Sequence, residues 1–171
     1  MRETKEFIFF FGKNDIYSNW HKCLFLENEM KFNCTEQYFM YHKAITFNDI
    51  NTAQKILASE SQAEQKKLGR MVKNFNTKQW NEKRQEIMYR ANYLKFSQNE
   101  KLKEQLLASG DKVLAEASPY DLTWGIGLAA NSTAAENTDL WRGQNLLGKI
   151  LMLIRQDLKL NNVNKINKKT I

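Results

Sequence analysis

A glutamate and a lysine, Glu36 and Lys43, lie seven positions apart in a segment with helical periodicity. Seven residues make close to two helical turns, so both side chains are expected on one face, about 10 Å apart along the axis. The helix dipole favours a carboxylate in the first turn, where Glu36 falls. A carboxyl group can act as general acid or base and an amine as nucleophile, so the pair is a candidate catalytic set. The alternative interpretation is an ordinary first-turn acid with a solvated lysine.

A short polar loop, Ser18-Asn19-Trp20, precedes a predicted hairpin. It offers a hydroxyl, an amide and an aromatic face for stacking. A turn followed by a core tryptophan is the alternative.

A second loop, residues 118–127, contains the only proline and a Trp-Gly-x-Gly run. Asp121 precedes Trp124 by three residues, and Gly125 follows directly. Glycines let a backbone approach a ligand closely, and binding groups are concentrated on loops. The segment is therefore a candidate binding loop, with a tight turn around a buried tryptophan as the alternative.

Hydrophobic periodicity indicates how these residues are positioned. Strands are predicted at 7–11 and 113–117, with a hairpin at 22–26 and 30–34 around the polar residues 27–29. Helices are predicted at 35–46, 48–58, 61–70, from 76 to about 95, 99–109 and 144–158. Their expected N-caps are Thr35, Asn48, Ser61, Asn76 and Asn99. The expected fold class is α+β: a mostly helical single domain with a small antiparallel sheet or hairpin.

Length and composition limit the classes of protein. A chain of 171 residues fits one domain, expected at 1–160, followed by a basic, disordered tail at 161–171. No apolar run is long enough to span a membrane, and no signal peptide is expected, so we predict a cytoplasmic protein. Two cysteines and two histidines do not suggest a zinc site.

The net charge of +7 indicates a weak attraction to anions. Three of the excess positive charges lie on Lys165, Lys168 and Lys169 in the tail. No long basic face interleaved with aromatic residues is visible in the remainder, so a dedicated DNA-binding stripe is not expected. No feature of the sequence indicates an oligomeric state.

A series of motifs in fixed order resembles the NADAR family, also called YbiA-like, over roughly residues 7–158. The motifs are Tyr17-Ser18-Asn19-Trp20, Thr35-Glu36-Gln37-Tyr38-Phe39 with Lys43, Leu68-Gly69-Arg70, Trp80, Lys95-Phe96, Leu107-Ala108-Ser109-Gly110-Asp111, the stretch 114–121, Trp124-Gly125-Ile126-Gly127 and the stretch 143–149. The resemblance implies a helix-dominated α+β fold and an N-glycosidase that needs no cofactor or metal. Residues 130–141 match no motif of the family, and Tyr17 stands where the family often has Phe.

The resemblance also implies the substrate class and the pocket residues. The substrates associated with the family are ADP-ribose on guanine bases, which makes ADP-ribosylated DNA or RNA an expected partner, and N-ribosylated pyrimidine 5′-phosphates of riboflavin synthesis. A non-catalytic module that binds ADP-ribose or NAD derivatives is the alternative from another class. The implied catalytic residues are Glu36, Lys43 and Asp121, and the implied substrate-binding residues are Ser18, Asn19, Trp20, Arg70, Trp124, Gly125 and Asn145.

Two routes could break the N-glycosidic bond. In one, the amine departs and leaves an oxocarbenium ion, with help from Glu36 and a second carboxylate, Asp121. In the other, the sugar ring opens and Lys43 captures the anomeric carbon as a Schiff base, which requires a lowered lysine pKa. Arg70 is expected to contact phosphate because its planar fork matches phosphate oxygens, and the two tryptophans are expected to stack or close the pocket.

Overall fold

The computed structural model describes residues 1–167, and the side chains through residue 161. The chain forms two compact units. The first comprises Met1–Ser18 and Glu100–Ile171 and is called the sheet unit; the second, Asn19–Asn99, is called the helical unit. The helical unit is continuous in sequence, whereas the sheet unit is assembled from the two ends of the chain.

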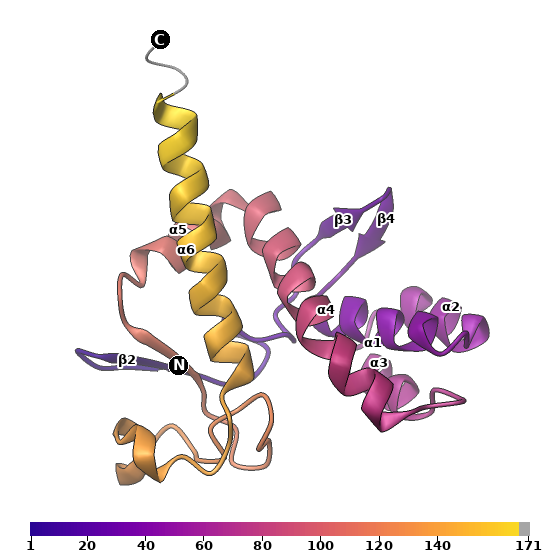
Figure 1. Cartoon of the computed structure of the whole chain (residues 1–171), viewed down its shortest axis with the longest axis horizontal. Coiled ribbons are helices and arrows are strands. Elements are labelled where there is room, and N and C mark those ends of the chain that lie inside the picture. The colour runs from indigo at the N-terminus through magenta and orange to yellow at the C-terminus, as the bar shows by residue number, and fades with distance from the viewer. Residues whose placement is uncertain (168–171) are drawn as a thin grey trace. The chain divides into compact units, whose positions relative to one another are not determined.

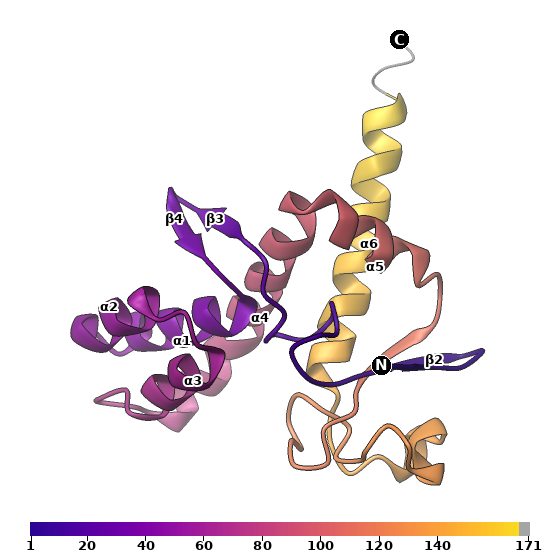
Figure 2. The same ribbon diagram turned by 180° about the vertical axis from the view of Figure 1, so that it is seen from behind.

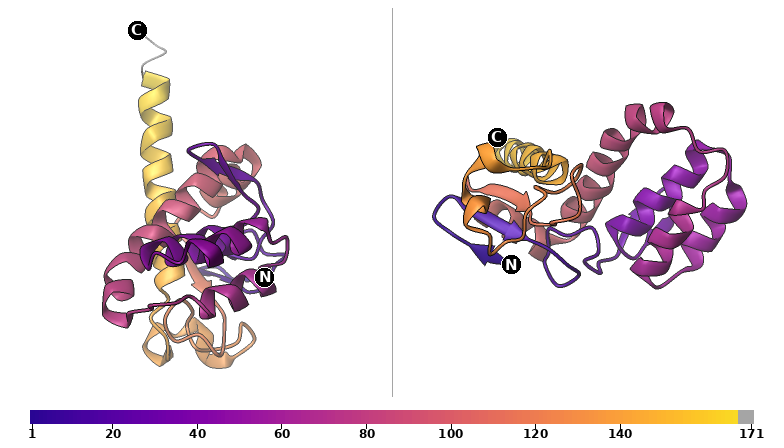
Figure 3. Two further views of the ribbon diagram at one scale, coloured as in Figure 1. Left: turned by 90° about the vertical axis from the view of Figure 1, so that its right-hand side faces the viewer. Right: turned by 90° about the horizontal axis from the view of Figure 1, so that it is seen from below.

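The sheet unit is built on three strands, β1 (Arg2–Glu3), β2 (Phe7–Phe10) and β5 (Val113–Glu116), in the order β1-β2-β5. β1 runs antiparallel to β2, and β2 runs parallel to β5 with Phe7 opposite Val113. All four residues of β2 are buried, as expected for a short apolar strand covered on both faces. Helix α6 (Leu146–Asn167) packs against β5 and α5 (Glu100–Ala108), and it is seen end-on beside the strands in Figure 3, right. Two 3₁₀ turns, η1 (Thr133–Glu136) and η2 (Thr138–Leu140), precede α6.

The helical unit begins with a hairpin of β3 (Phe25–Glu27) and β4 (Met30–Phe32). Asn28 and Glu29 form its turn with positive φ, the conformation that tight hairpins require. Helices α1 (Thr35–Thr46), α2 (Ile50–Ala58), α3 (Gln62–Arg70) and α4 (Thr77–Gln98) follow. α1 packs against each of the other three, so it is the central helix of this unit (Figures 1 and 2).

The predicted α+β class is confirmed, and most predicted elements are present. The N-caps Ser61 and Asn76 are confirmed, since their side chains accept from the backbone N–H of Glu64 and Gln79. Two other caps are wrong by one position. The side chain of Cys34, not Thr35, caps α1, and that of Asp49, not Asn48, caps α2. Asn48 instead has positive φ and makes the turn between the two helices.

Two features of the structure go beyond the expectations. The predicted antiparallel hairpin is present as β3–β4, and a second, mixed sheet forms because β2 also pairs in parallel with β5, a strand distant in sequence. The last helix continues past the predicted end at Leu158 to Asn167, since residues 159–167 contain neither proline nor glycine to end it. Residues 161–167 of the predicted disordered tail are therefore helical, and residues 168–171 lie outside the described residues. In residues 1–167, no helix is both long and apolar enough to cross a membrane.

Candidate active site

Helix α1 carries both Glu36 and Lys43, as the spacing predicted. Glu36 lies in the first turn and is only 5% exposed. Its backbone N–H donates to the carbonyl oxygen of Asn19 over 2.9 Å, which joins the predicted Ser18–Trp20 loop to the start of the helix. The side chain of Asn19 is buried and accepts from Asn92 Nδ2 of α4 over 3.4 Å. The structure thus brings Asn19 and Glu36 together.

Lys43 lies in the last turn of α1, where its ammonium group is surrounded on several sides. Lys43 Nζ donates to the carbonyl oxygen of Gly69 over 2.8 Å. It also lies 4.2 Å from the ring centroid of Phe75 and 6.0 Å from that of Trp80, within the range of cation–π attraction. Burial lowers the pKa of Lys43 below its ordinary value, which increases the fraction of neutral, nucleophilic amine near neutral pH.

Two other predicted residues of the helical unit lie at its surface. Arg70 is the last residue of α3 and is exposed, next to the glycine that binds Lys43. An exposed guanidinium at this position can meet a phosphate without a large desolvation cost. Trp20 is half-buried, and Lys66 Nζ of α3 lies 5.7 Å from its ring centroid.

The second predicted loop lies in the sheet unit, and Asp121 organises it. Asp121 Oδ1 accepts from the backbone N–H groups of Thr123 and Trp124, over 2.9 and 2.7 Å. Gly125 is buried, and a Cβ there would lie 2.9 Å from the carbonyl oxygen of Glu116. Glycine at 125 is therefore required for packing of the loop against the end of β5.

Asn145 is almost fully buried and has φ of 51°. Its Oδ1 accepts from the N–H of Glu116 over 3.1 Å, and its Nδ2 donates to the carbonyl of Leu114 over 2.9 Å. The side-chain amide thus pairs with β5 as a neighbouring strand would. Its backbone N–H donates to the carbonyl of Gly125. These bonds make Asn145 a positioning residue, and its predicted contact with substrate stays a prediction.

The predicted site residues therefore fall into two groups. Asn19, Trp20, Glu36, Lys43 and Arg70 belong to the helical unit, whereas Ser18, Asp121, Trp124, Gly125 and Asn145 belong to the sheet unit. Ser18 is buried, and its N–H donates to the carbonyl oxygen of Asp15. The predicted catalytic set of Glu36, Lys43 and Asp121 draws on both groups and stays a prediction.

Two further residues have unusual surroundings, and neither was predicted as a site residue. Phe75, which contacts Lys43, lies in a loop and carries no periodic signal. Lys95 of α4 is fully buried, and burial lowers its pKa to about 8. Lys95 belongs to the Lys95-Phe96 motif of the family resemblance, which gave it no role in the site, and a fully buried lysine is rare.

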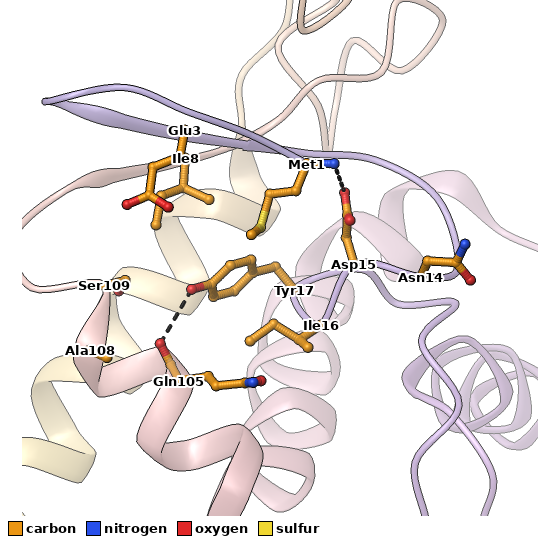
Figure 4. Close-up of a pocket in the computed structure, with 10 residues that line it drawn as sticks. All are labelled: Met1, Glu3, Ile8, Asn14, Asp15, Ile16, Tyr17, Gln105, Ala108 and Ser109. Atoms are coloured by element: carbon orange, nitrogen blue, oxygen red, sulfur yellow. Dashed lines mark hydrogen bonds and ion pairs between the residues drawn. The ribbon is translucent and has the colours of Figure 1, made fainter.

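A cavity of about 300 Å³ in the sheet unit is not part of the predicted site (Figure 4). Tyr17 lines it and donates its hydroxyl to the carbonyl of Gln105 over 3.4 Å. Glu3 and Asp15 also face it, and neither lysine nor arginine is among its lining residues. The carboxylate of Asp15 is paired with the N-terminal ammonium group of Met1, which also lines the cavity, and the carboxylate of Glu3 is paired with Lys112.

Comparison with known proteins shows several similarities. Residues 9–159 match the NADAR domain. An N-glycosidase of Acanthamoeba polyphaga mimivirus is 40% identical over 91% of this chain and 98% of its own length. A riboflavin biosynthesis protein of Vibrio vulnificus is 34% identical over 70% of this chain but only 29% of its own length. The NMR structure of the Escherichia coli protein YbiA matches 95% of this chain and 90% of that chain with a TM-score of 0.76 and 24% identity, a likeness of fold.

Proposed function

The chain belongs to the NADAR domain family, and on this premise we propose that it is an N-glycosidase that releases ADP-ribose from ADP-ribosylated guanine bases of nucleic acid. Support for N-glycosidase activity comes from the mimivirus N-glycosidase, which this chain matches over nearly its whole length. The positive net charge supports a polyanionic substrate.

One structural observation carries the chemical part of the proposal. The buried Glu36 and the partly desolvated Lys43 lie on one helix, α1, which three helices hold in place. The amine of Lys43 is oriented by the Gly69 carbonyl and two aromatic rings. A fixed amine with a lowered pKa is suited to attack an electrophilic carbon.

We favour the route through Lys43. As the sugar ring opens, the leaving nitrogen forms a double bond to the anomeric carbon and the ring oxygen takes up a proton. The neutral amine of Lys43 adds to that carbon, and the base departs with its electron pair and a proton supplied by Glu36. Water then adds to the resulting imine and releases the sugar aldehyde and the lysine. In the alternative route, the bond to the base breaks first and the ring oxygen stabilises the cation, with Asp121 as the second carboxylate.

The second candidate substrate is an N-ribosylamino-pyrimidine 5′-phosphate of riboflavin synthesis. It is supported by the similarity to part of a riboflavin biosynthesis protein. The same chemistry would serve, because this substrate also carries a nitrogen on the anomeric carbon of a phosphorylated ribose. It does not need an extended basic surface.

The test is incubation of the purified chain with a guanine-ADP-ribosylated DNA oligonucleotide and, separately, with the ribosylamino-pyrimidine 5′-phosphate. Mass spectrometry measures what is released, and Glu36→Gln is the chemical control. Free ADP-ribose from the oligonucleotide, lost in Glu36→Gln, would support the proposal. Release of ribose 5-phosphate alone would assign the metabolic substrate. Binding of both without turnover would favour the non-catalytic module, and activity retained in Glu36→Gln would refute the role of Glu36.

A further inference from the structure

Phe75 differs from the other aromatic residues around Lys43 in its exposure. It lies in the loop between α3 and α4 and is 44% exposed, whereas its neighbours Phe47 and Trp80 are buried. Its ring contacts Phe47 edge-on, with centroids 5.2 Å apart, and it covers the ammonium group of Lys43. A large apolar side chain is thus held beside the candidate nucleophile with much of its surface available to a ligand.

The loop that presents Phe75 is anchored on both sides. Val72 is buried, and Asp49 Oδ2 accepts from the N–H of Lys73 over 2.9 Å. Asn74 has φ of 56°, a conformation favoured by asparagine, which redirects the chain just before Phe75. Asn76 then caps α4. The exposed position of Phe75 is therefore built into the fold of the helical unit.

The distance to Lys43 limits what Phe75 can touch. The ring centroid lies 4.2 Å from Lys43 Nζ. A sugar carbon that reaches this amine carries the scissile bond with it, so the group on the far side of that bond comes within reach of the ring. Stacking of an aromatic face on a planar base contributes favourable binding free energy, whereas contact of the same face with a phosphate contributes little.

Charge around the loop also favours nucleic acid. Residues 65–81 contain five basic residues and neither aspartate nor glutamate: Lys66, Lys67, Arg70, Lys73 and Lys78. Lys67 is paired with Glu64, whereas Arg70, Lys73 and Lys78 are exposed. This stretch is too short to form a dedicated DNA-binding stripe, but it surrounds an exposed aromatic residue, Phe75. Cationic groups beside a stacking platform are characteristic of single-stranded nucleic-acid binding.

We propose that Phe75 is a specificity-determining residue that stacks on the nucleobase of the substrate while Lys43 engages the sugar, with the basic residues of 65–81 attracting the adjoining phosphates. This inference rests on the proposed function. It assigns to Phe75 the part of the same site that binds the leaving group, the nucleobase.

The test measures binding rather than turnover, in a Glu36→Gln background that keeps the substrate intact. Phe75→Ala and Phe75→Trp are compared with Phe11→Ala, a matched control at an exposed phenylalanine of the sheet unit. Fluorescence anisotropy gives Kd for a guanine-ADP-ribosylated oligonucleotide, and calorimetry gives Kd for free ADP-ribose. We expect Phe75→Ala to weaken oligonucleotide binding about tenfold. The Kd of Phe75→Ala for free ADP-ribose should stay within about twofold of that of the Glu36→Gln parent. Phe75→Trp and Phe11→Ala should bind both ligands as the parent does.

Two results would overturn the inference. Equal oligonucleotide binding by Phe75→Ala and its parent would show that the ring does not contact the base. An equal loss for free ADP-ribose would show that the ring contacts another part of the ligand. If the wild type binds but does not cleave the oligonucleotide, the proposed function fails, and the binding comparison still decides the role of Phe75. If it neither binds nor cleaves, both proposals fail.

Discussion

The two groups of predicted site residues use their polar atoms differently. In the sheet unit, Asp121 and Asn145 direct side-chain oxygens and nitrogens at nearby backbone groups. In the helical unit, Glu36 and Lys43 lie on one regular helix whose own backbone bonds do not depend on them, although Lys43 Nζ also donates to a backbone group of α3, the Gly69 carbonyl. The loop group thus determines local backbone shape, whereas the helix group presents functional groups on a scaffold that already exists.

This difference suggests a division of labour. Residues whose side chains complete the backbone hydrogen bonds of a loop should affect stability when they are replaced. Residues whose side chains are not needed for the backbone hydrogen bonds of their own helix should affect chemistry more than stability. The following predictions test this contrast, from the largest expected effect to the smallest.

Lys43→Ala should lower kcat by at least about a thousandfold, because it removes the proposed nucleophile. Borohydride should trap a covalent sugar adduct on the wild type and none on the variant, as seen by intact-protein mass spectrometry. Lys55→Ala, an exposed lysine on α2, is the matched control and should behave as wild type. Full activity in Lys43→Ala would eliminate the Schiff-base route.

Asn145→Ala should lower the free energy of unfolding by about 2–4 kcal/mol. It leaves the N–H of Glu116 and the carbonyl of Leu114 without their partner and puts alanine at positive φ. Urea titration monitored by circular dichroism measures the change, with exposed Asn131→Ala as control. If Asn145→Ala were as stable as wild type but inactive, Asn145 would have a chemical role. The contrast between structural residues in the sheet unit and chemical residues in the helical unit would then fail.

Lys95 makes the free energy of unfolding depend on pH in the alkaline range. Its pKa falls from 10.5 to about 8 on folding because burial disfavours the ammonium form. Between these values the unfolded chain holds a proton that the folded chain has released, so this group's contribution to stability rises with pH. Relative to Lys95→Met, the wild type should gain on the order of 2–3 kcal/mol between pH 7.5 and about 10.5.

The difference between the two proteins must be taken at each pH, because other groups titrate in this range. Burial also raises the pKa values of Cys23 and Cys34, the latter to about 12, and these thiols contribute to both proteins. Urea unfolding at a series of pH values gives the comparison. A difference that does not change with pH would show that Lys95 keeps its ordinary pKa.

Asp121→Asn should have the smallest effect, a loss of activity below about tenfold. Asparagine keeps an Oδ1 that can accept from the N–H groups of Thr123 and Trp124. Asp121→Ala removes this acceptor and should lower the free energy of unfolding by about 1 kcal/mol. If Asp121→Asn abolishes turnover while the loop stays folded, Asp121 is a catalytic carboxylate and the route through an oxocarbenium ion gains support.

Local signals explain how much of the fold was predictable. The helix carrying Glu36 and Lys43 was predicted to within one residue of its observed ends, because its apolar spacing and polar first turn are encoded locally. Caps at Ser61 and Asn76 follow from well-known preferences. Cys34 was missed because a thiol is an unusual cap, and Asp49 because Asn48 beside it is an equally good candidate.

Long-range features were not predictable from one sequence. The parallel pairing of β2 with β5 joins segments about a hundred residues apart, and the sequence of neither strand indicates which strand it pairs with. The same limit applies to the site. Residue types indicated Glu36 and Lys43, whereas the contact of Phe75 with Lys43 depends on how the loop before α4 folds back.

The pairing of β2 with β5 has a consequence for synthesis of the chain. The helical unit is complete once residue 99 has left the ribosome, whereas β2 must wait for residues 113–116 before its parallel partner exists. During that interval Phe7-Ile8-Phe9-Phe10 is an apolar strand with one open edge, the kind of segment that pairs with other chains. We therefore expect chains that stop before β5 to aggregate through their first ten residues, even though their helical unit is entire.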